Sequence, residues 1–351
     1  MPDMKTKLSD EKIRRIQELK AKGVSCREIA EVLGVSPSTV SKYSGKNSSP
    51  SEDTDKHIKP KFDSPPQKRV DPIKFLDQAI ARTEQHPIDP DYCKIKIDTT
   101  EPIAVMKAAD LHFGGLDIDY ISLQAHIKFL LNTPNFYLQL FGDDLNLMIM
   151  HRTVGARHDG WTPEEQVYWL ESFVDKCTEQ GKLLSMCWGN HSDEFTERTA
   201  GFGLVRMLMK NKIPYFRGLG YIDLQVGKQT YPMGFTHKTR FHSFMNQLHG
   251  NKRLQQMHTE FFGVGRMPCR EYITAHTHTP AVSWEGCLPE DRVFFIKCGT
   301  FKTRCLFSQR YFGQGAIGVP TVVYHPDRML HLCFSTPWEA HTYMKGLKVN
   351  G

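Results

Sequence analysis

The chain has 351 residues, of which 40% are hydrophobic and 24% are charged, a composition typical of a soluble protein with a sizeable core. Its length predicts two or three domains. No apolar run approaches the ~18 residues of a membrane-spanning helix, and the first residues lack the apolar stretch of a secretory signal. The nine cysteines are odd in number and never form C-x-x-C, which argues against a disulfide framework and a zinc ribbon. We therefore expect a cytoplasmic protein that binds no membrane.

Positive charge is concentrated in the N-terminal fifth of the chain. Residues 1–70 contain 15 Lys and Arg against 10 Asp and Glu, while the formal net charge of the whole chain is only +6. A basic segment of this kind favours a polyanionic partner, although basic solvated tails are also common.

Residues 9–43 are predicted to form three short helices. Apolar side chains recur at helical spacing in the first. Ser25 and Glu28 form a capping box at the start of the second, in which each side chain bonds the backbone N–H of the other residue. Ser36 and Pro37 give the third helix an N-cap followed by proline at its first position.

The second and third helices are separated by a three-residue turn at 34–36, which is typical of a helix-turn-helix. The segment SCREIAEVLGVSPSTVSKY resembles the helix-turn-helix of resolvases and related transposition proteins. In such a module Ser38, Thr39 and Lys42 would lie at the groove-facing start of the recognition helix. DNA is therefore the expected partner. A helical bundle that docks another protein is the alternative.

The next segment differs sharply in composition. Residues 44–72 are rich in Ser, Pro, Lys and Asp and contain almost no aliphatic side chains, which predicts a disordered tether. We therefore expect a DNA-binding domain at 1–45, a linker at 46–72 and a larger domain at 73–351.

The larger domain is predicted to mix strands and helices. The predicted strands cover residues 103–109, 136–141, 183–188, 221–226, 231–235, 272–275, 293–297 and 321–324. The predicted helices cover residues 119–131, 163–180 and 204–211. Strands and helices alternate at first and strands follow closely later, which indicates an α/β domain whose second sheet is more antiparallel.

Five short polar blocks follow predicted strands. In chain order they are Asp110-Leu111-His112, Gly142-Asp143, Gly189-Asn190-His191, His237 and His276-Thr277-His278. Residues two apart on an extended chain point the same way, so Asp110 and His112 can reach one ion, and the two imidazoles of the last block point the same way. Each block alone is typical of ordinary loop residues. All five in this order, each after an apolar strand, indicate a metal site.

This order of blocks resembles the calcineurin-like metallophosphoesterases over about residues 103–300. The resemblance implies a two-sheet β-sandwich flanked by helices, preceded here by the small all-α helix-turn-helix domain. It implies one ion held by Asp110, His112, Asp143 and His278. It implies a second ion held by Asp143, Asn190, His237 and His276. His191 is similar to the family's imidazole that contacts the phosphate and aids the leaving oxygen, while a hydroxide bridging the ions attacks phosphorus.

The ligand set of imidazole, carboxylate and amide oxygen suits Mn²⁺, Fe or Zn²⁺, and we favour Mn²⁺. Two such ions about 3.5–4 Å apart can clamp a phosphate. Four positions depart from the family pattern, none of them an expected ligand: Asn146 and Ser192 stand where Asp is frequent, and Thr236 and Ala275 where Gly is usual.

An insertion follows the second block. Residues 151–160 contain two histidines together with Arg152 and Arg157. We expect these arginines to contact the DNA backbone, because phosphate contacts position a strand without reading its sequence. A solvated loop is the alternative.

The fold serves many substrates, so the choice among them depends on the N-terminal module. A tethered DNA-binding module raises the local concentration of DNA at the site. We therefore expect a two-metal phosphodiesterase acting on DNA, resembling the repair-exonuclease branch and the phosphoesterases of bacteriophages and mobile elements. The alternatives are a phosphatase or nucleotide phosphodiesterase targeted to DNA, and a DNA-binding protein with a non-catalytic scaffold. Whether the chain forms a homodimer stays open.

Overall fold

The computed structural model describes residues 8–44, 71–85, 92–147, 159–209, 212–239, 248–262, 268–303 and 315–349. The chain divides into two compact units, 1–83 and 84–351. The predicted three-part division of the chain stays a prediction.

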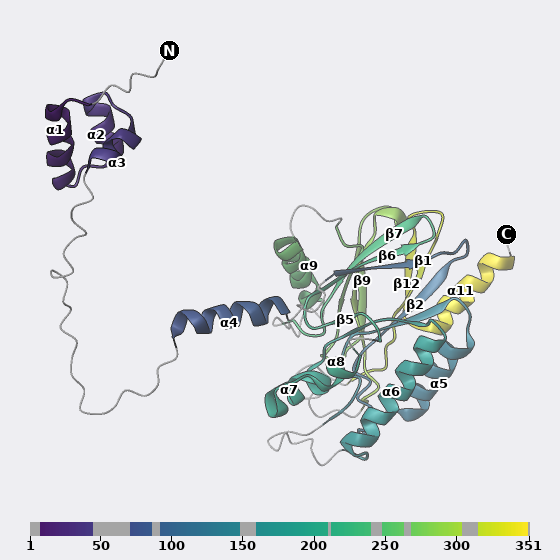
Figure 1. The fold of residues 1–351 in the computed structure, drawn as a ribbon. Coiled ribbons are helices and arrows are strands. Elements are labelled where there is room, and N and C mark those ends of the chain that lie inside the picture. Colours follow the sequence, from purple (N-terminus) through teal and green to yellow (C-terminus); the bar gives the residue numbers. More distant parts are fainter. Residues whose placement is uncertain are drawn as a thin grey trace, which may run out of the picture. The chain divides into compact units, whose positions relative to one another are not determined.

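Three short helices begin the first unit, as predicted: α1 (Asp10–Ala21), α2 (Cys26–Leu33) and α3 (Pro37–Tyr43) (Figure 1). They share a small core of buried side chains formed by Ile16, Ile29, Ala30 and Val40. The predicted capping box is present, because Ser25 and Glu28 each accept a hydrogen bond from the other's backbone N–H. Gly34 turns the chain between α2 and α3 at a φ of 60°, which a residue without Cβ adopts readily.

A fourth helix, α4 (Pro72–Gln85), is not predicted from the sequence. Asp71 caps it, since its Oδ1 accepts a 3.0 Å hydrogen bond from the N–H of Ile73. Ile73, Leu76 and Ile80 are exposed along it. The helix begins at the last residue of the predicted linker, and residues 46–70 of that linker lie outside the described residues.

The second unit contains two six-stranded sheets (Figure 1). Sheet I has the order β12 (His331–Phe334), β11 (Thr321–Tyr324), β2 (Ile103–Ala108), β3 (Phe136–Leu140), β4 (Leu183–Cys187) and β5 (Tyr215–Phe216). Sheet II has the order β1 (Tyr92–Ile97), β6 (Gly220–Val226), β7 (Gln229–Phe235), β8 (Glu271–Thr274), β10 (Val293–Lys297) and β9 (Ala281–Glu285). The predicted two-sheet sandwich is confirmed.

The main core lies between the sheets, where Val105 and Phe141 from the sheet I side pack with Leu224 and Phe235 from sheet II. Helices cover the outer faces (Figure 1). Sheet I packs against α5 (Tyr120–Asn132), α6 (Pro163–Glu179), α8 (Leu204–Met209) and α11 (Pro337–Val349). Sheet II packs against α9 (His249–Phe262). The short helix α7 (Phe195–Ala200) precedes α8.

The expectation that the second sheet is more antiparallel is wrong. Each sheet has three parallel and two antiparallel strand pairs. Parallel neighbours need a crossover connection, and α9 provides one between β7 and β8. That helix is not among the predicted ones, which is why the later strands suggested hairpins.

The parallel pairing explains where the polar blocks meet. β2, β3 and β4 run side by side in the same direction, so the loops that follow them leave the same edge of sheet I. β7 and β8 are likewise parallel in sheet II. The carboxyl ends of parallel strands are where α/β proteins place their ligand sites.

Candidate metal centre

The five polar blocks predicted from the sequence come together in the second unit. Their side chains form three overlapping groups of potential metal ligands, and within each group the ligand atoms lie within 4.8 Å of one another. The groups are Asp110, His112 and His278; His112, Asp143 and His191; and Asp143, His237 and His276. His112 and Asp143 each belong to two groups, so the groups form one continuous centre.

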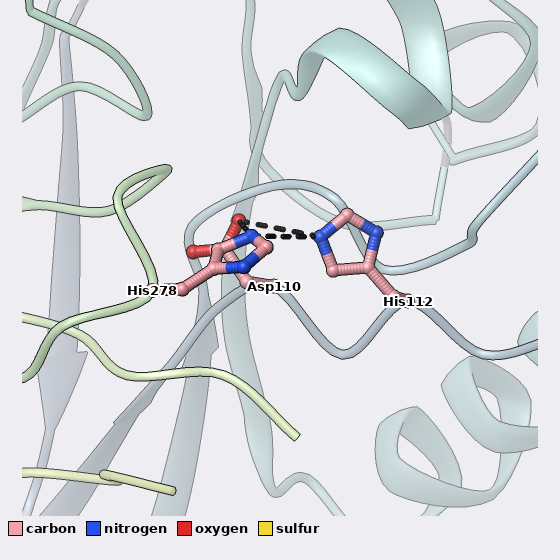
Figure 2. Close-up of side chains that lie close together, drawn as sticks. All are labelled: Asp110, His112 and His278. Atoms are coloured by element: carbon pink, nitrogen blue, oxygen red, sulfur yellow. Dashed lines mark hydrogen bonds and ion pairs between the residues drawn. The ribbon is translucent and has the colours of Figure 1, made fainter. Parts of the chain in front are cut away.

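The first group joins the end of β2 to the loop after β8 (Figure 2). Nε2 of His112 and Nε2 of His278 lie 3.1 Å apart. Oδ1 of Asp110 lies 3.7 Å from the His112 nitrogen and 3.5 Å from the His278 nitrogen. The other carboxylate oxygen of Asp110 accepts a 2.9 Å hydrogen bond from the N–H of His276, which ties the two sheets together at the centre.

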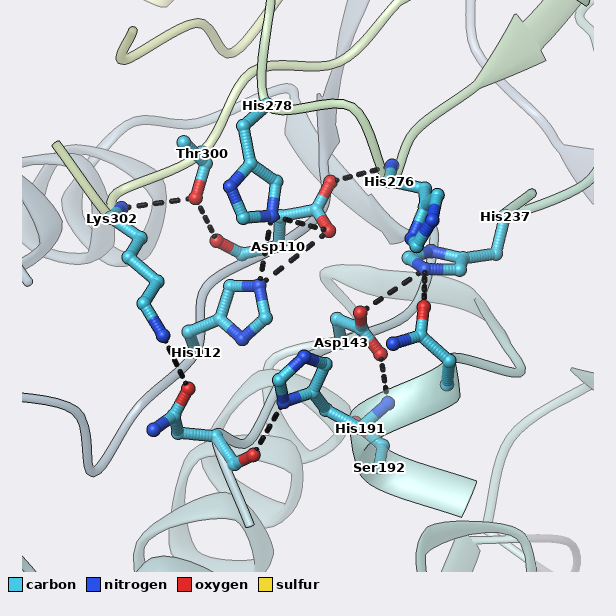
Figure 3. A network of polar contacts seen from close by, with 12 residues as sticks. Asp110, His112, Asp143, His191, Ser192, His237, His276, His278, Thr300 and Lys302 are labelled. Carbon is cyan, nitrogen blue, oxygen red and sulfur yellow. Dashed lines mark hydrogen bonds and ion pairs between the residues drawn. The ribbon is translucent and has the colours of Figure 1, made fainter. Parts of the chain in front are cut away.

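The third group is built around Asp143, at the end of β3, with His237 and His276 (Figure 3). Nε2 of His237 lies 3.2 Å from Oδ2 of Asp143 and 3.1 Å from Oδ1 of Asn190. Nδ1 of His237 donates to the carbonyl of Phe141 over 2.7 Å, so Nε2 is the nitrogen that faces the carboxylate. The predicted ligand Asn190 therefore lies with this group.

Two buried carboxylate oxygens favour a cation here. Oδ1 of Asp110 and Oδ2 of Asp143 accept no hydrogen bond from the described part of the chain. A buried carboxylate oxygen without a donor is costly unless a cation compensates it. The imidazoles of His112 and His278 lie beside Asp110, and the imidazole of His237 and the amide of Asn190 lie beside Asp143. Both sets of side chains suit a divalent transition metal. The residues present thus fit two ions.

The backbone is strained at the same positions. Asp110, His112, Asp143, His276 and His278 have φ between 47° and 72°, the left-handed region that residues with a Cβ rarely adopt. Such strain persists where the surrounding structure holds it, and it clusters at functional sites. The loops are therefore shaped to aim these side chains inward.

Two glycines allow the second and third blocks to pack closely. A Cβ at Gly189 would lie 2.1 Å from the backbone nitrogen of Asp143, and one at Gly142 would lie 2.4 Å from the carbonyl oxygen of Trp188. Both blocks therefore need glycine for the β3 and β4 loops to meet.

Burial lowers the pKa of several histidines of the centre, and among these only at His237 does a nearby charge outweigh it. Burial lowers the pKa of His112, and the nearby His191 and Lys302 lower it further. Burial also lowers the pKa of His276. Burial alone would lower the pKa of His237, but the Asp143 carboxylate raises it to about 9. The neutral state of His112 and His276 is the one that binds metals.

His191 is held by two hydrogen bonds. Its backbone N–H donates to Oδ1 of Asp143 over 2.7 Å, and its ring Nδ1 donates to the carbonyl of Asn146 over 2.7 Å. Its ring meets that of His112 edge-on, with centroids 4.5 Å apart. Burial lowers its pKa. Because Nδ1 is engaged, Nε2 is the nitrogen left for a ligand or a substrate.

Two residues of the centre have no role predicted from the sequence. Asn146 stands out there only as a departure from the family pattern, yet it positions His191. Lys302 donates to Oδ1 of Asn146 over 2.9 Å. No motif surrounds Lys302, so only the folded chain brings it to the centre.

The predicted DNA contacts fall in two places. Ser38, Thr39 and Lys42 lie on α3, where Ser38 and Lys42 are exposed and Thr39 is half-buried. The hydroxyls of Ser38 and Thr39 both bond that of Ser36, each over 2.8 Å. Arg152 and Arg157 lie outside the described residues.

Among the helices that the structure describes, there is no candidate for a membrane-spanning segment.

Residues 5–42 match the family model of a helix-turn-helix domain. No curated protein matches the chain in sequence. Among solved structures, it is similar to the NAD nucleotidase of Haemophilus influenzae, with 10% identity, a TM-score of 0.37, and 66% of this chain covering 49% of that one. The chain thus spans about half the length of that nucleotidase.

Two further solved structures are similar. The calcineurin-like phosphoesterase YfkN of Bacillus subtilis shows 11% identity and a TM-score of 0.31, with 68% of this chain covering 91% of that one. Vps29 of Chaetomium thermophilum shows 12% identity and a TM-score of 0.34, with 67% of this chain covering 100% of that one.

Proposed function

We propose that this chain is a two-metal phosphodiesterase that acts on DNA. The observation that carries the proposal is the continuous centre of buried carboxylate and imidazole groups, in which Asp143 belongs to two ligand groups. A chain that also matches a helix-turn-helix family over residues 5–42 has a second module suited to DNA.

In this proposal one ion is held by Asp110, His112, Asp143 and His278. The other is held by Asp143, Asn190, His237 and His276. Mn²⁺ is the favoured ion, with Fe or Zn²⁺ as alternatives. Two bound divalent ions would supply Lewis acidity to the phosphate oxygens and lower the pKa of a coordinated water. The shared carboxylate of Asp143 sets the spacing of the two ligand groups.

His191 is proposed as the acid that serves the leaving oxygen. Its Nδ1 is fixed by the Asn146 carbonyl, so a proton on Nε2 would point away from that anchor. A proton delivered from Nε2 to the leaving oxygen makes it an alcohol instead of an alkoxide, which is the step that general acids accelerate. The second hydrogen bond, from the backbone N–H of His191 to Asp143, holds this residue next to the carboxylate that would bind both ions.

The DNA would be held by two further sets of residues. Ser38, Thr39 and Lys42 on α3 are proposed to face a groove, as the second helix of such modules does. Arg152 and Arg157 are proposed to contact the backbone of the strand that enters the centre. Phosphate contacts of both kinds would raise affinity and make it depend on salt.

Metal removal and restoration test the proposal directly. The purified chain is stripped with a chelator, reloaded with Mn²⁺, and incubated with end-labelled single- and double-stranded DNA, with bis-p-nitrophenyl phosphate, and with a nucleotide and p-nitrophenyl phosphate. We expect hydrolysis of the diester and of DNA only after reloading. Hydrolysis of nucleotides or phosphomonoesters with none of DNA would instead support a phosphatase or nucleotide phosphodiesterase.

Asp143→Asn should lower metal content and activity most, because its carboxylate belongs to two ligand groups. Asp175→Asn is the matched control, since that carboxylate is exposed and pairs with Lys212 over 2.7 Å on the surface. Metal content is measured by mass spectrometry beside the rate. An Asp143→Asn variant with full metal content and full rate would contradict the assignment.

A further inference from the structure

Lys302 places an ammonium group beside the centre. It lies five residues after β10, and its backbone forms an isolated bridge with Ile118. Its side chain is only 10% exposed. Nζ donates to Oδ1 of Asn146 over 2.9 Å and lies 3.6 Å from Oδ1 of Asp117 (Figure 3). The first partner is a neutral amide, and the second lies beyond hydrogen-bond distance.

Asn146 connects this ammonium group to His191. The carbonyl oxygen of Asn146 accepts from Nδ1 of His191 over 2.7 Å, its Oδ1 accepts from Lys302, and its Nδ2 donates to Asp159. An amide can accept and donate at once in this way, whereas a carboxylate at this position would face Asp159 with like charge. Asn146, which departs from the family pattern, thus holds both the Lys302 and the His191 side chains.

The charge of Lys302 acts at the centre. Its ammonium group is bonded to Asn146, whose backbone carbonyl also holds the His191 ring, and that ring meets the His112 ring edge-on. The proposed ligand set has only two carboxylates, Asp110 and Asp143, for two divalent ions. Adding Lys302 makes the excess positive charge larger. Cations that share a largely buried site repel one another, and an anion bound among them removes this repulsion.

We propose that Lys302 binds an oxygen of the phosphate that occupies the metal centre, and so forms a phosphate-binding subsite together with His191. The inference rests on the proposed function, because it assumes that an anionic phosphate is the ligand of the centre. Lys302 would add a charged contact that requires no metal coordination. Its anchoring by Asn146 reduces the side-chain freedom that a lysine otherwise loses on binding.

Binding of inorganic phosphate provides the test, because it needs no turnover. The full chain loaded with Mn²⁺ is titrated with inorganic phosphate by calorimetry, for the wild type, Lys302→Met and Lys302→Arg. Lys128→Met is the matched control, since Lys128 is exposed on α5 and bonds Gln124. The KM and kcat for bis-p-nitrophenyl phosphate are measured on the same four proteins.

We expect Lys302→Met to weaken phosphate binding about 10-fold, the loss of one charge-assisted hydrogen bond worth ~1.4 kcal/mol. Mn²⁺ affinity should equal or exceed that of the wild type, because the substitution removes a positive charge near the ions. Lys302→Arg, which keeps the charge, should bind phosphate more tightly than Lys302→Met, and Lys128→Met should match the wild type. The weaker binding should raise KM for the diester.

Four results would overturn the inference. They are unchanged phosphate affinity in Lys302→Met, loss of its Mn²⁺ binding, failure of both Lys302 variants to fold, and absence of phosphate binding to the loaded wild type. The second and third would make Lys302 a structural residue. Failure of the proposed function is a separate outcome: the wild type would bind phosphate through Lys302 and yet leave DNA intact.

Discussion

At the scale of single residues, His191 is the histidine of the centre to which the proposal assigns no metal, and its Nδ1 is bonded to the backbone carbonyl of Asn146 in the loop after β3. His191→Ala should leave the metal content intact and lower kcat for bis-p-nitrophenyl phosphate by about 10²–10⁴-fold, the range that acid–base groups contribute. Rates and metal content are measured together. His249→Ala, at an exposed position on α9, is the control.

The same experiment distinguishes a proton donor from a ligand. His191 also belongs to a group of potential metal ligands with His112 and Asp143. A loss of bound metal in His191→Ala would therefore contradict the acid role and make His191 a ligand.

His258 gives a prediction about stability and pH. The side chain is buried on α9, its Nε2 forms no hydrogen bond with the described residues, and burial lowers its pKa to about 4. The unfolded chain, in which a histidine titrates near 6.5, binds more protons between these values. The contribution of neutral His258 to stability is thus fully present above about pH 6.5 and is lost as pH falls toward 4.

The expected loss is about 3 kcal/mol over that window. It is measured by urea unfolding of the wild type and His258→Gln at pH 7 and near pH 4.5. The variant should lose less stability on acidification than the wild type, because its amide does not titrate. Equal losses in the two proteins would show that His258 is not responsible.

At the scale of elements, β2 and β8 are joined by a buried ion pair. Nζ of Lys107 lies 3.2 Å from Oε2 of Glu271, and both side chains are fully buried. Tyr324 donates to the other oxygen of Glu271, and Lys107 also donates to Gln139. β2 leads to Asp110 and β8 to His276, so this pair connects the two strands that lead to proposed ligands from opposite sheets.

Lys107→Met should destabilise the second unit by roughly 3–5 kcal/mol, because it leaves the Glu271 carboxylate buried without a counter-charge. Adding Glu271→Gln should recover a large part of the loss, since the amide still accepts from Tyr324. All five tryptophans lie at residue 161 or later, so tryptophan fluorescence during urea unfolding follows this unit. A double variant as unstable as the single one would contradict the charge argument.

At the scale of the whole molecule, the two compact units predict separable activities. A chain that starts at Asp71 lacks α1, α2 and α3, which have a core of their own. It should hydrolyse bis-p-nitrophenyl phosphate at the rate of the full chain. Its affinity for duplex DNA should fall, and the slope of log Kd against log salt should flatten by ~0.9 for each phosphate that the three helices neutralise in the full chain.

Filter binding at several salt concentrations, with the small diester as the control substrate, measures both effects. DNA binding that is unchanged in the shorter chain would favour the protein-docking alternative for the three helices. A loss of diester hydrolysis would instead show that the first unit supports the metal centre.

The sequence by itself determined the features that depend on neighbouring residues. Capping at Ser25 and Ser36 is confirmed, because a cap is a hydrogen bond over three residues. All eight predicted strands and all three predicted helices of the second unit are present, with ends within two residues of those expected. The positions of the polar blocks after strands follow from the same local pattern.

Other elements were missed for local reasons. The edge strand β1 alternates between half-buried and exposed residues, so it has little of the continuous apolar character of β2. α4 exposes Ile73, Leu76 and Ile80, and it follows a segment whose composition suggests disorder. The short strand β5 has only two residues, too few for any periodic pattern.

Only the tertiary structure decided which blocks meet. Asp110 and the N–H of His276 are 166 residues apart in the chain and 2.9 Å apart in space, a contact that depends on the parallel pairing in both sheets. Lys302 reaches Asn146 across 156 residues without any motif of its own. Local hydrogen bonds are encoded within a few residues, whereas such contacts depend on strand order and register, which many distant residues set together.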